Sequence, residues 1–415
     1  MTHEAKPPIV LVGASLAGGR AAEYLRRQKY EGRIVVVGDE PHAPYDRPPP
    51  SKKLLRGQLE EEKLFFRPAS YYAEHAIELE LGVRATRLVP HEKTLVLSDG
   101  RALAYDKLLI ATGAHVRRLT CEGSDLGNVF MMRTLSDSKA IASVIRPGAR
   151  IVVIGAGVIG SEVAAACREE GCIVTMLETE KTPLVRAFGH EIGAYYAGVH
   201  RDRGVDLRLG VSATRLRGEG GKVTAVELGD GTEIACDAVV VGIGIIPTTD
   251  WLEDSGIATD RGVLVDVHCR TNAEDVYAAG DVARFWNDAA NGYVALESVD
   301  NAQGMAAVAC ERMLGRDAKH VPVPYFWSDQ YDLKLQSVGY VGNYDRVIYR
   351  GSTAKNEAGK LAFAAFHVRG KKLVFFVGVN RLKEMAGAKK LIGAGVDVTD
   401  AQLADETFAL GSLVP

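Results

Sequence analysis

Ile9-Val10-Leu11-Val12-Gly13-Ala14-Ser15-Leu16-Ala17-Gly18 opens the first folded segment of this chain, and the same pattern returns as Ile151-Val152-Val153-Ile154-Gly155-Ala156-Gly157-Val158-Ile159-Gly160. Each stretch is an apolar run of strand length, then a glycine turn, then an Ala-rich helical stretch. The turn places a helix N-terminus, with free N–H groups and a favourable dipole, under a pyrophosphate. Two such loops predict two bound dinucleotides, and electron transfer between them is the natural reason to bind both.

Length and composition limit the class of protein. The 415 residues exceed a single core, and 47% hydrophobic with 25% charged residues is ordinary for a globular protein. No apolar run approaches the roughly 18 residues of a membrane helix, and no signal-peptide apolar region precedes Ile9, so we expect a cytoplasmic protein with no membrane role. The net charge of −3 argues against nucleic-acid binding.

The order of the motifs predicts the domains. Pro147-Gly148 starts a second nucleotide-binding unit, and a flavin-type Gly280-Asp281 follows a later apolar strand, so the second unit interrupts the first. We predict an α/β fold with two Rossmann-like dinucleotide-binding domains, the NAD domain inserted in the FAD domain, plus a C-terminal α+β domain. The expected boundaries are 1–118 and 246–320 for FAD, 119–245 for NAD, and 321–415 for the last domain.

The first loop departs from the usual fingerprint, because Ser15 stands where a second glycine normally lets the backbone approach the pyrophosphate. Serine is small, and its hydroxyl could itself reach a phosphate oxygen. Asp39 or Glu40 follows Gly18 by 21 or 22 residues, close to the ribose-binding offset. The Asp281 carboxylate could bind ribityl hydroxyls, although a Gly-Asp pair alone is more often a turn.

The second loop keeps all three glycines, and Glu178 lies 18 residues after Gly160 at the end of the next strand. A carboxylate there accepts from the adenosine 2′-hydroxyl and repels a 2′-phosphate, which favours NADH. Lys181 and Arg186 could accept a phosphate and weaken that preference. Glu162, near the start of the helix, could favour the dipole at its first turn. The NAD candidates are Gly155, Gly157, Val158, Ile159, Gly160, Glu162, Glu178, Arg186, Gly242, Ile243 and Gly244.

Several further stretches are typical of one family: Pro44-Tyr45-Asp46-Arg47-Pro48-Pro49-Pro50-Ser51-Lys52, Asp99-Gly100-Arg101 with Tyr105-Asp106, Arg133-Thr134-Leu135, Glu297-Ser298-Val299 with Asn301-Ala302, and Phe326-Trp327-Ser328-Asp329-Gln330-Tyr331. Over nearly its whole length the chain resembles the FAD-dependent ferredoxin reductases of bacterial oxygenase systems, of the glutathione-reductase-like superfamily. Pro50 and Val299-Asp300 depart from the residues expected there.

The resemblance implies the site residues. A Lys–Glu pair lies beside flavin nitrogen-5 in the superfamily, and the matching catalytic candidates are Lys52 and Glu162; two exposed charges in separate loops are the alternative. Trp327 would pack near the flavin, unless its aromatic run belongs to the core. With the loop residues, the FAD candidates are Gly13, Ser15, Leu16, Ala17, Gly18, Asp39, Glu40, Arg47, Lys52, Ala85, Ala111, Thr112, Gly113, Arg133, Gly280, Asp281, Glu297, Ser298, Val299 and Trp327.

The cysteines decide the type of reaction. Disulfide reductases of the superfamily carry a Cys-x4-Cys pair before the Pro-Ser-Lys run, and here those positions are Ala43 and Pro48. Cys167 and Cys172 have the right spacing in the wrong place, so we interpret them as structural thiols. None of the six cysteines has the spacing of a metal site, and we predict no metal.

Without a sulfur relay, electrons must leave the flavin for an outside acceptor. The resemblance implies hydride transfer from NADH to FAD, then single electrons to a two-iron ferredoxin that feeds a monooxygenase or a Rieske-type dioxygenase, with at most a weak homodimer. The residues that could steer an acidic ferredoxin are Arg369, Lys371, Lys372, Lys383, Lys389 and Lys390.

The sequence leaves three alternative functions open. An NADH oxidase or peroxidase would use a redox cysteine near the flavin, and none occurs before Cys121. A signalling flavoprotein of the apoptosis-inducing-factor type would carry insertions and a targeting segment that are not seen. A rubredoxin reductase is a close variant of the main hypothesis.

Overall fold

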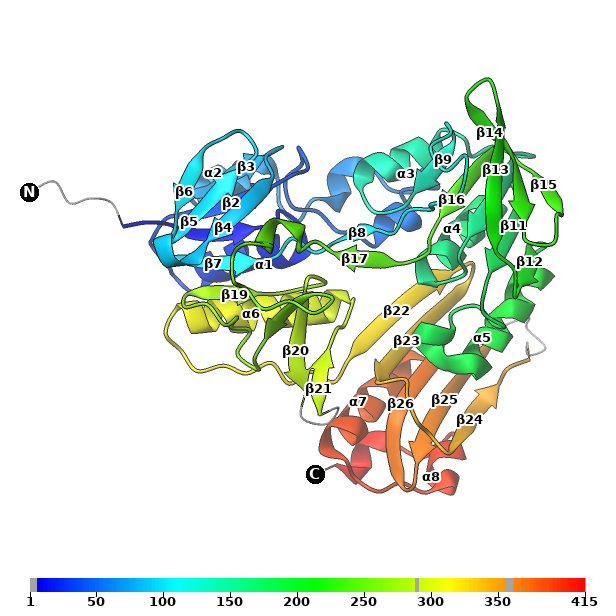
Figure 1. The fold of residues 1–415 in the computed structure, drawn as a ribbon. Coiled ribbons are helices and arrows are strands. Elements are labelled where there is room, and N and C mark those ends of the chain that lie inside the picture. Colours follow the sequence, from blue (N-terminus) through cyan, green and yellow to red (C-terminus); the bar gives the residue numbers. More distant parts are fainter. Residues whose placement is uncertain (1–5, 288–290, 355–360, 415) are drawn as a thin grey trace, which may run out of the picture. The chain divides into compact units, whose positions relative to one another are not determined.

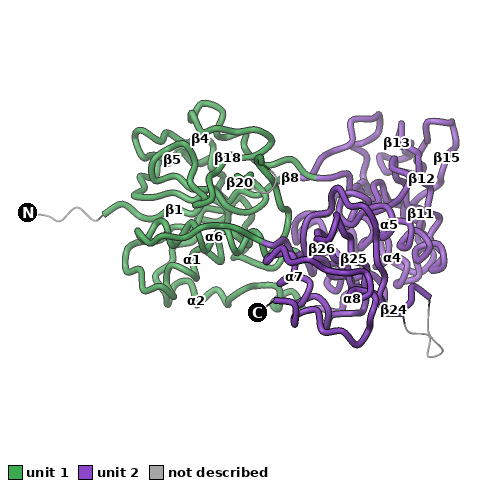
Figure 2. The backbone as a smooth tube through the Cα atoms, turned by 90° about the horizontal axis from the view of Figure 1, so that it is seen from below, with its two compact units in different colours: residues 1–47, 60–115, 245–322 green, residues 48–59, 116–244, 323–415 purple. Residues whose placement is uncertain are grey.

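The computed structural model describes residues 6–287, 291–354 and 361–414. The chain divides into two compact units (Figure 2): residues 1–47, 60–115 and 245–322 form the first, and residues 48–59, 116–244 and 323–415 form the second. The second unit therefore holds both the predicted NAD-binding and C-terminal segments, together with the short segment 48–59. The predicted division into three domains stays a prediction.

The first unit is built on a five-stranded parallel sheet in the order β19-β7-β1-β2-β3 (Figure 1). Its strands are apolar and almost wholly buried at the centre, as expected for a sheet covered on both faces. The elements are β1 (Ile9–Val12), α1 (Leu16–Arg27), β2 (Ile34–Gly38), α2 (Ala69–Glu74), β3 (Ile77–Leu81), β7 (Lys107–Ile110), β19 (Val276–Ala278) and α6 (Val299–Met313). Because β19 pairs with β7 long after β7 in the chain, the predicted insertion is confirmed.

Two small sheets complete this unit. One contains β4 (Ala85–Val89), β5 (Thr94–Leu97) and β6 (Ala102–Ala104), and the other contains β18 (Val263–Val265), β20 (Ala283–Asn287) and β21 (Gly292–Val294). The strands β8 (Ala114–Val116) and β17 (Ile245–Pro247) pair where the chain leaves and re-enters the unit.

The second unit repeats the same design with the parallel sheet β12-β11-β10-β16-β9. The elements are β9 (Val129–Met131), α3 (Leu135–Ala142), β10 (Arg150–Ile154), α4 (Val158–Glu169), β11 (Ile173–Glu178), α5 (Val185–Asp202), β12 (Asp206–Leu209) and β16 (Ala238–Val241), with the hairpin sheet β13 (Ala213–Glu219), β14 (Lys222–Leu228) and β15 (Glu233–Ala235). The expected fold class is confirmed by these two sheets.

The C-terminal segment of the same unit is an antiparallel sheet in the order β22-β23-β26-β25-β24. Its strands are β22 (Tyr325–Gln330), β23 (Leu333–Gly339), β24 (Arg346–Ser352), β25 (Ala362–Arg369) and β26 (Lys372–Val379), followed by α7 (Met385–Ala394) and α8 (Asp400–Ala404). One apolar cluster joins this sheet to α7 and α8, and another joins it to Phe188, Ile192 and Tyr196 of α5. The packing against α5 ties the C-terminal sheet to the second nucleotide-binding fold.

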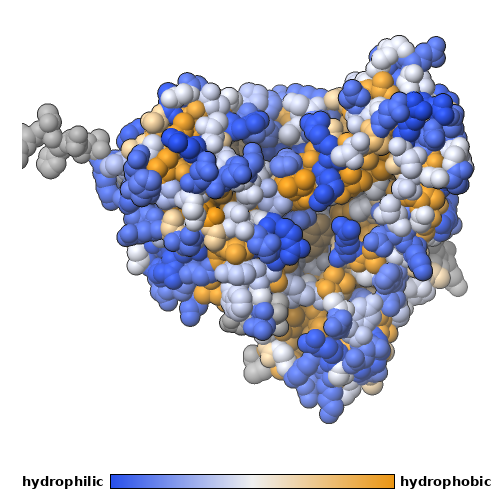
Figure 3. Space-filling view, viewed as in Figure 1, coloured by the Kyte–Doolittle hydropathy of each residue, from blue (hydrophilic) through white to orange (hydrophobic). Residues whose placement is uncertain are grey.

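Polar residues cover most of the face shown in Figure 3, and the apolar residues in view form separate patches. Within the described ranges, every helix is too short or too polar to cross a bilayer.

Candidate functional site: two dinucleotide loops and a buried ion pair

The first glycine loop joins β1 to α1 and needs glycine for close packing. Gly13 has φ +127°, and a Cβ there would lie 2.1 Å from the carbonyl oxygen of Ala111. A Cβ on Gly18 would lie 1.9 Å from the carbonyl oxygen of Gly13. The helix therefore begins directly against the sheet edge, where its N-terminus can receive a pyrophosphate. These contacts fit an FAD-binding loop.

The Gly-Asp segment and the start of α6 come to the same place. A Cβ on Gly280 would meet the side chains of Ala17 and Ala302 at 3.3 and 3.6 Å, so this turn packs on the first turns of both α1 and α6. Ser298 is the N-cap of α6, since its hydroxyl accepts from the N–H of Asn301 at 3.3 Å. The structure thus brings together three predicted FAD segments that are far apart in the sequence.

The Ser15 side chain makes a hydrogen bond that could not be predicted from the sequence. Its hydroxyl accepts from Arg47 Nε at 2.8 Å, and the Arg47 guanidinium also pairs with the Glu40 carboxylate. The buried Tyr45 donates to Glu40 Oε2 at 2.6 Å. Of the two acidic candidates, Glu40 is therefore engaged in this cluster, whereas Asp39 is exposed. Sequence reasoning missed Tyr45, although it stands two residues before Arg47.

The remaining FAD candidates are divided between the units. In the first unit, Ala111-Thr112-Gly113 follows β7, Ala85 is the buried first residue of β4, Val299 begins α6, and Glu297 is exposed. Lys52, Arg133 and Trp327 belong to the second unit.

The second glycine loop joins β10 to α4 with the same packing. A Cβ on Gly155 would lie 2.4 Å from the carbonyl oxygen of Gly242, and one on Gly160 would lie 2.0 Å from that of Gly155. A Cβ on Gly157, in contrast, meets no atom within 4 Å. The outer two glycines are therefore required by the packing, while the middle one leaves open space above the backbone, as a loop that receives a pyrophosphate requires.

Glu178 ends β11 beside this loop. Its Oε2 accepts from the N–H of Ala156 at 2.8 Å, and its Oε1 accepts from the N–H of Glu180 at 2.9 Å. The N–H of Gly155 bonds the carbonyl of Leu177 as that of Gly13 bonds Val37, so Glu178 occupies the position that Gly38 has in the first unit. In the first unit the acidic candidates Asp39 and Glu40 follow the last residue of β2, whereas in the second unit Glu178 is itself the last residue of β11.

The other NAD candidates lie around the same edge. Ile159, on the first turn of α4, is 41% exposed, Arg186 is exposed on the first turn of α5, and Gly242-Ile243-Gly244 directly follows β16.

Lys52 and Glu162 form an ion pair inside the second unit. Lys52 Nζ lies 2.9 Å from Glu162 Oε2, and the two side chains are 15% and 1% exposed. Ser51 donates to the same oxygen at 2.7 Å, and Ser328 donates to Oε1 at 2.7 Å. Burial raises the pKa of the Glu162 carboxyl, and the ammonium of Lys52 with the two hydroxyls opposes that shift. The alternative of two exposed charges in separate loops is excluded.

One expectation for Glu162 is wrong. The helix dipole at the first turn was the alternative to pairing with Lys52, but Glu162 is the fifth residue of α4, whose first turn holds no acidic residue. Ser51 and Ser328 are the partners that sequence reasoning missed. The sequence carried no signal for Ser328, because Ser328, Asp329 and Gln330 are all polar, and only the strand geometry of β22 buries the first and third of them while Asp329 is exposed.

The described residues contain six free cysteines, and no group of three or more His, Cys, Asp or Glu side chains there could hold a metal ion. Cys167 and Cys172 are fully buried at the C-terminal end of α4. At 1.5 Å per residue, Cys167 lies about 15 Å from the glycine loop that begins the helix. This distance supports the interpretation of both cysteines as structural thiols.

Trp327 is half-buried on β22 and stacks on Tyr325 with ring centroids 5.8 Å apart, while Phe326 packs in the core against Phe188. The aromatic run is thus only partly core.

The six basic residues of the C-terminal segment do not form one cluster. Arg369, Lys371 and Lys372 lie at the β25–β26 turn, whereas Lys383 lies beyond the other end of β26 and Lys389 and Lys390 lie on α7. Eight residues of strand separate Lys383 from the β25–β26 turn by about 25 Å. The helix α7 leads back towards that turn, since Lys372 donates to the carbonyl of Gly395 at its C-terminal end, so Lys389 and Lys390 lie between the two ends. Lys372 is also paired with Asp397 at 2.6 Å.

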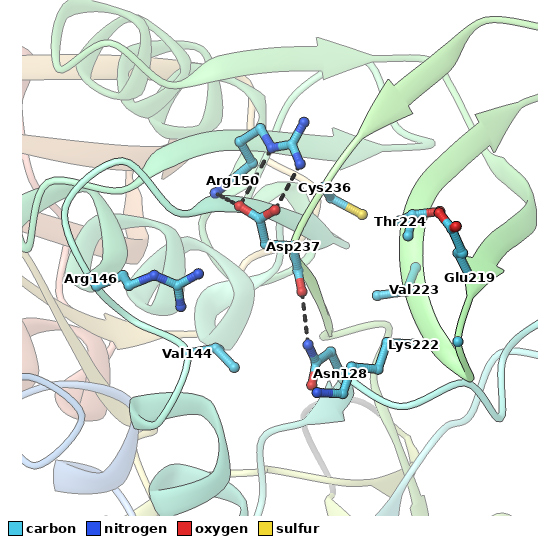
Figure 4. A pocket seen from close by; sticks show the side chains of 11 residues that line it. Asn128, Val144, Arg146, Arg150, Glu219, Lys222, Val223, Thr224, Cys236 and Asp237 are labelled. Atoms are coloured by element: carbon cyan, nitrogen blue, oxygen red, sulfur yellow. Dashed lines mark hydrogen bonds and ion pairs between the residues drawn. The ribbon is translucent and has the colours of Figure 1, made fainter.

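A hollow of about 420 Å³ lies where the strands of the second parallel sheet begin, at the end of the sheet opposite the glycine loop (Figure 4). Arg150 begins β10 there, and its guanidinium and backbone N–H both bond the Asp237 carboxylate. The other polar side chains of the lining are those of Asn128, Arg146, Glu219, Lys222 and Thr224. Because this hollow is at the amino ends of the strands, it is separate from the dinucleotide loop at their carboxyl ends.

Residues 7–306 match the family model of pyridine nucleotide-disulphide oxidoreductases, and residues 325–414 match that of the reductase C-terminal domain. The chain belongs to this oxidoreductase family. A ferredoxin–NAD(P)+ reductase of a Sphingomonas species is 38% identical over 93% of this chain and 92% of its own length. FAD and NADH as cofactors agree with this membership.

Two solved structures are similar over nearly the whole chain. The ferredoxin reductase for the CYP199A2 system of Rhodopseudomonas palustris has a TM-score of 0.94 and 35% identity, covering 99% of this chain and 100% of that one. A covalent putidaredoxin reductase–putidaredoxin complex has a TM-score of 0.93 and 35% identity, covering 99% and 98%. The predicted family resemblance is confirmed.

Proposed function

We propose that this chain is an NADH:ferredoxin reductase that supplies electrons, through a two-iron ferredoxin, to a monooxygenase or a Rieske-type dioxygenase. The observation that carries the proposal is a buried ion pair in a family whose disulfide enzymes use a thiol pair. Lys52 and Glu162 meet at 2.9 Å, while Ala43 and Pro48 stand where the two sulfurs would be. Two electrons accepted from NADH then have no protein disulfide to reduce and leave for another protein.

The residues that would hold FAD are those of the first loop and its neighbours. The α1 N-terminus would bind the pyrophosphate, Arg47 and Ser15 would border it, and Asp39 or Glu40 would bind the ribose. The Asp281 carboxylate, on a turn packed against α1 and α6, would bind the ribityl hydroxyls. When bound, FAD accepts a hydride and gives up its electrons singly.

The second loop would hold NADH, with the open backbone at Gly157 under the pyrophosphate. Glu178 stands at the strand end, where its charge would repel a 2′-phosphate and its oxygens would accept from a 2′-hydroxyl. Lys52 and Glu162 would set the electrostatic field at the flavin ring. Neither charge would be stable there alone, because a buried unpaired ion is costly.

The partner is expected to be a small acidic iron–sulfur protein that the reductase meets in successive encounters. We assign the docking role to the start of α7 and the residues before it, where Lys383 and Lys390 are exposed and Lys389 is half-buried. We place the reaction in the cytoplasm with at most a weak homodimer and no nucleic acid or membrane partner. Electrostatic steering of this kind speeds encounter and weakens with salt.

The test is NADH-driven reduction of cytochrome c by the FAD-loaded protein, with and without a two-iron ferredoxin. We expect rapid flavin reduction by NADH and cytochrome c reduction that depends on the ferredoxin. The Cys167→Ala/Cys172→Ala variant is the control for a sulfur relay and should retain the ferredoxin-dependent rate within about twofold, because both thiols lie at the far end of α4.

Two outcomes would overturn the proposal. Rapid oxygen consumption with NADH alone would indicate an oxidase, and loss of ferredoxin reduction in the cysteine variant, with flavin reduction intact, would indicate a thiol relay. A rubredoxin replacing the ferredoxin at higher kcat/KM would change the partner but not the reaction class.

A further inference from the structure

A continuous hydrogen-bonded chain connects Glu162 with the far side of the second unit. Ser328 donates to Glu162 Oε1 at 2.7 Å, and Gln330 Nε2 donates to Ser328 Oγ at 3.2 Å. His200 Nε2 lies 3.0 Å from Gln330 Oε1, and His200 Nδ1 lies 3.0 Å from the Tyr331 hydroxyl. Ser328, Gln330 and His200 are each no more than 1% exposed. Water therefore does not compete for these bonds.

Each hydrogen bond in this series is donated in the direction of Glu162, beginning at the Tyr331 hydroxyl. Because Ser328 accepts from the Gln330 amide, its own proton is available to the carboxylate. Because Gln330 presents its oxygen to His200, the Nε2 of His200 carries the ring proton and Nδ1 accepts from Tyr331. Burial lowers the pKa of His200 to about 4, so the ring is neutral, as this arrangement requires.

The direction of the chain depends on the charge of Glu162. A Glu162 protonated on Oε1 would have to donate to Ser328, which would then donate to the Gln330 oxygen, and the Gln330 amide would have to rotate so that its NH₂ faces His200. The amide orientation is thus coupled to protonation of the Glu162 oxygen that faces Ser328. Lys52 at 2.9 Å and Ser51 at 2.7 Å select the ionised form from the other oxygen.

The local structure is built to make this chain. Ser328 and Gln330 point to the buried side of β22, and Tyr331 adopts φ +56°, an unusual conformation for a side chain of its size. Arg203 lies over the Tyr331 ring, 4.9 Å from its centroid, and pairs with Asp332. The chain thus ends in residues held at the surface by α5 and the β22–β23 turn.

We propose that Ser328, Gln330 and His200 are positioning residues that keep the Glu162 carboxylate ionised and oriented towards Lys52. The inference rests on the proposed role of the Lys52–Glu162 pair at the flavin. A neutral histidine and a glutamine suit this role because they supply direction without adding a second buried charge. The other ionisable groups that interact with Glu162 or the chain ends are Tyr196, Arg168, Glu169 and Arg203.

The test uses the FAD-loaded protein and three substitutions. Gln330→Met and His200→Leu remove the chain, while His200→Gln keeps an N–H donor towards Gln330. Infrared difference spectra between Glu162 and Glu162→Gln backgrounds assign the carboxyl stretch and report its ionisation, and stopped-flow reduction by NADH gives the rate. His367→Leu is the matched control, because His367 is a buried histidine of the same unit that takes no part in the hydrogen bonds from Glu162 to Tyr331.

We expect Gln330→Met and His200→Leu to produce a protonated-carboxyl band at neutral pH and to slow flavin reduction about tenfold at unchanged KM for NADH, the scale of one buried hydrogen bond between neutral groups. His200→Gln should restore both readouts to within about twofold of the parent, and His367→Leu should leave both unchanged.

An ionised Glu162 in Gln330→Met and His200→Leu, or equal effects of His200→Leu and His367→Leu, would overturn the inference. The infrared readout does not depend on ferredoxin. Failure of ferredoxin reduction by the parent protein would therefore count against the proposed function alone. A carboxyl band that is the same in the variants as in the parent would count only against the positioning role of Ser328, Gln330 and His200.

Discussion

The Glu178 carboxylate accepts a hydrogen bond from the backbone N–H of Ala156 at 2.8 Å, so the acidic residue at the end of β11 is fastened to the glycine loop that begins α4. The same carboxylate accepts from Glu180 N–H, which fixes its orientation at the strand end. A charge held in this way cannot swing away from a 2′-phosphate. The proposed preference for NADH therefore rests on one fixed side chain.

Replacing this residue should change the coenzyme. We expect Glu178→Arg to raise the NADPH-to-NADH ratio of kcat/KM by about tenfold or more, because repulsion of the phosphate becomes attraction. Glu178→Gln, which removes only the charge, should give a smaller increase. Steady-state kinetics with both coenzymes measures the ratio, and an identical ratio in all three proteins would refute the assignment.

The contributions of Lys52 and Glu162 to the free energy of unfolding should depend strongly on each other. Lys52→Met leaves an unpaired buried carboxylate and should lower the free energy of unfolding by about 3 kcal/mol, and the double variant Lys52→Met/Glu162→Gln should regain most of that loss. Urea unfolding of the four proteins of the cycle gives the coupling free energy. Additive losses in the double variant would show that the two charges do not stabilise each other.

The basic residues near α7 should govern the rate of encounter with the ferredoxin. We expect Lys383→Glu/Lys389→Glu/Lys390→Glu to slow ferredoxin reduction at low ionic strength by about tenfold or more and to spare ferricyanide reduction, with the difference shrinking as salt is added. Lys29→Glu/Lys222→Glu/Lys319→Glu carries the same change in net charge at exposed positions elsewhere and is the control. Equal slowing by both triple variants, or equal loss with ferricyanide, would exclude a docking role.

Three buried histidines should make the protein acid-sensitive. Burial lowers the pKa of His200, His320 and His367 to about 4, from the ordinary value of 6.5. Their contribution to stability is complete above about pH 6.5. It falls as the pH drops towards 4, because the unfolded chain takes up protons that the folded chain refuses, by roughly 3 kcal/mol per histidine.

Urea unfolding between pH 7.5 and 4.5 at saturating FAD measures this loss. His367→Phe is the informative variant, since His367 packs against the rings of Tyr344 and Phe375, a contact that a phenylalanine ring can also make. We expect a shallower acid slope in His367→Phe than in the parent. An unchanged slope would show that His367 does not contribute to the pH dependence.

The sequence by itself determined the two nucleotide-binding folds and their order. An apolar run followed by closely spaced glycines is a local pattern, and the backbone contacts at Gly13, Gly18, Gly155 and Gly160 leave no room for a Cβ. The insertion was also predictable from the sequence, because the apolar segment before Gly280-Asp281 provides the strand that completes the first parallel sheet. The absence of cysteine at positions 43 and 48 excluded a disulfide relay without any coordinates.

Only the tertiary structure decided the partners of each side chain. It placed Glu162 in the second turn of α4 and not the first, joined it to Lys52 across 110 positions of sequence, and spread the basic residues from the β25–β26 turn along α7 to Lys383. It also revealed the chain from Ser328 to His200, which two distant segments contribute. Hydrogen bonds and ion pairs depend on atoms within about 3 Å, and only the packing of α4, α5 and β22 brings these atoms together.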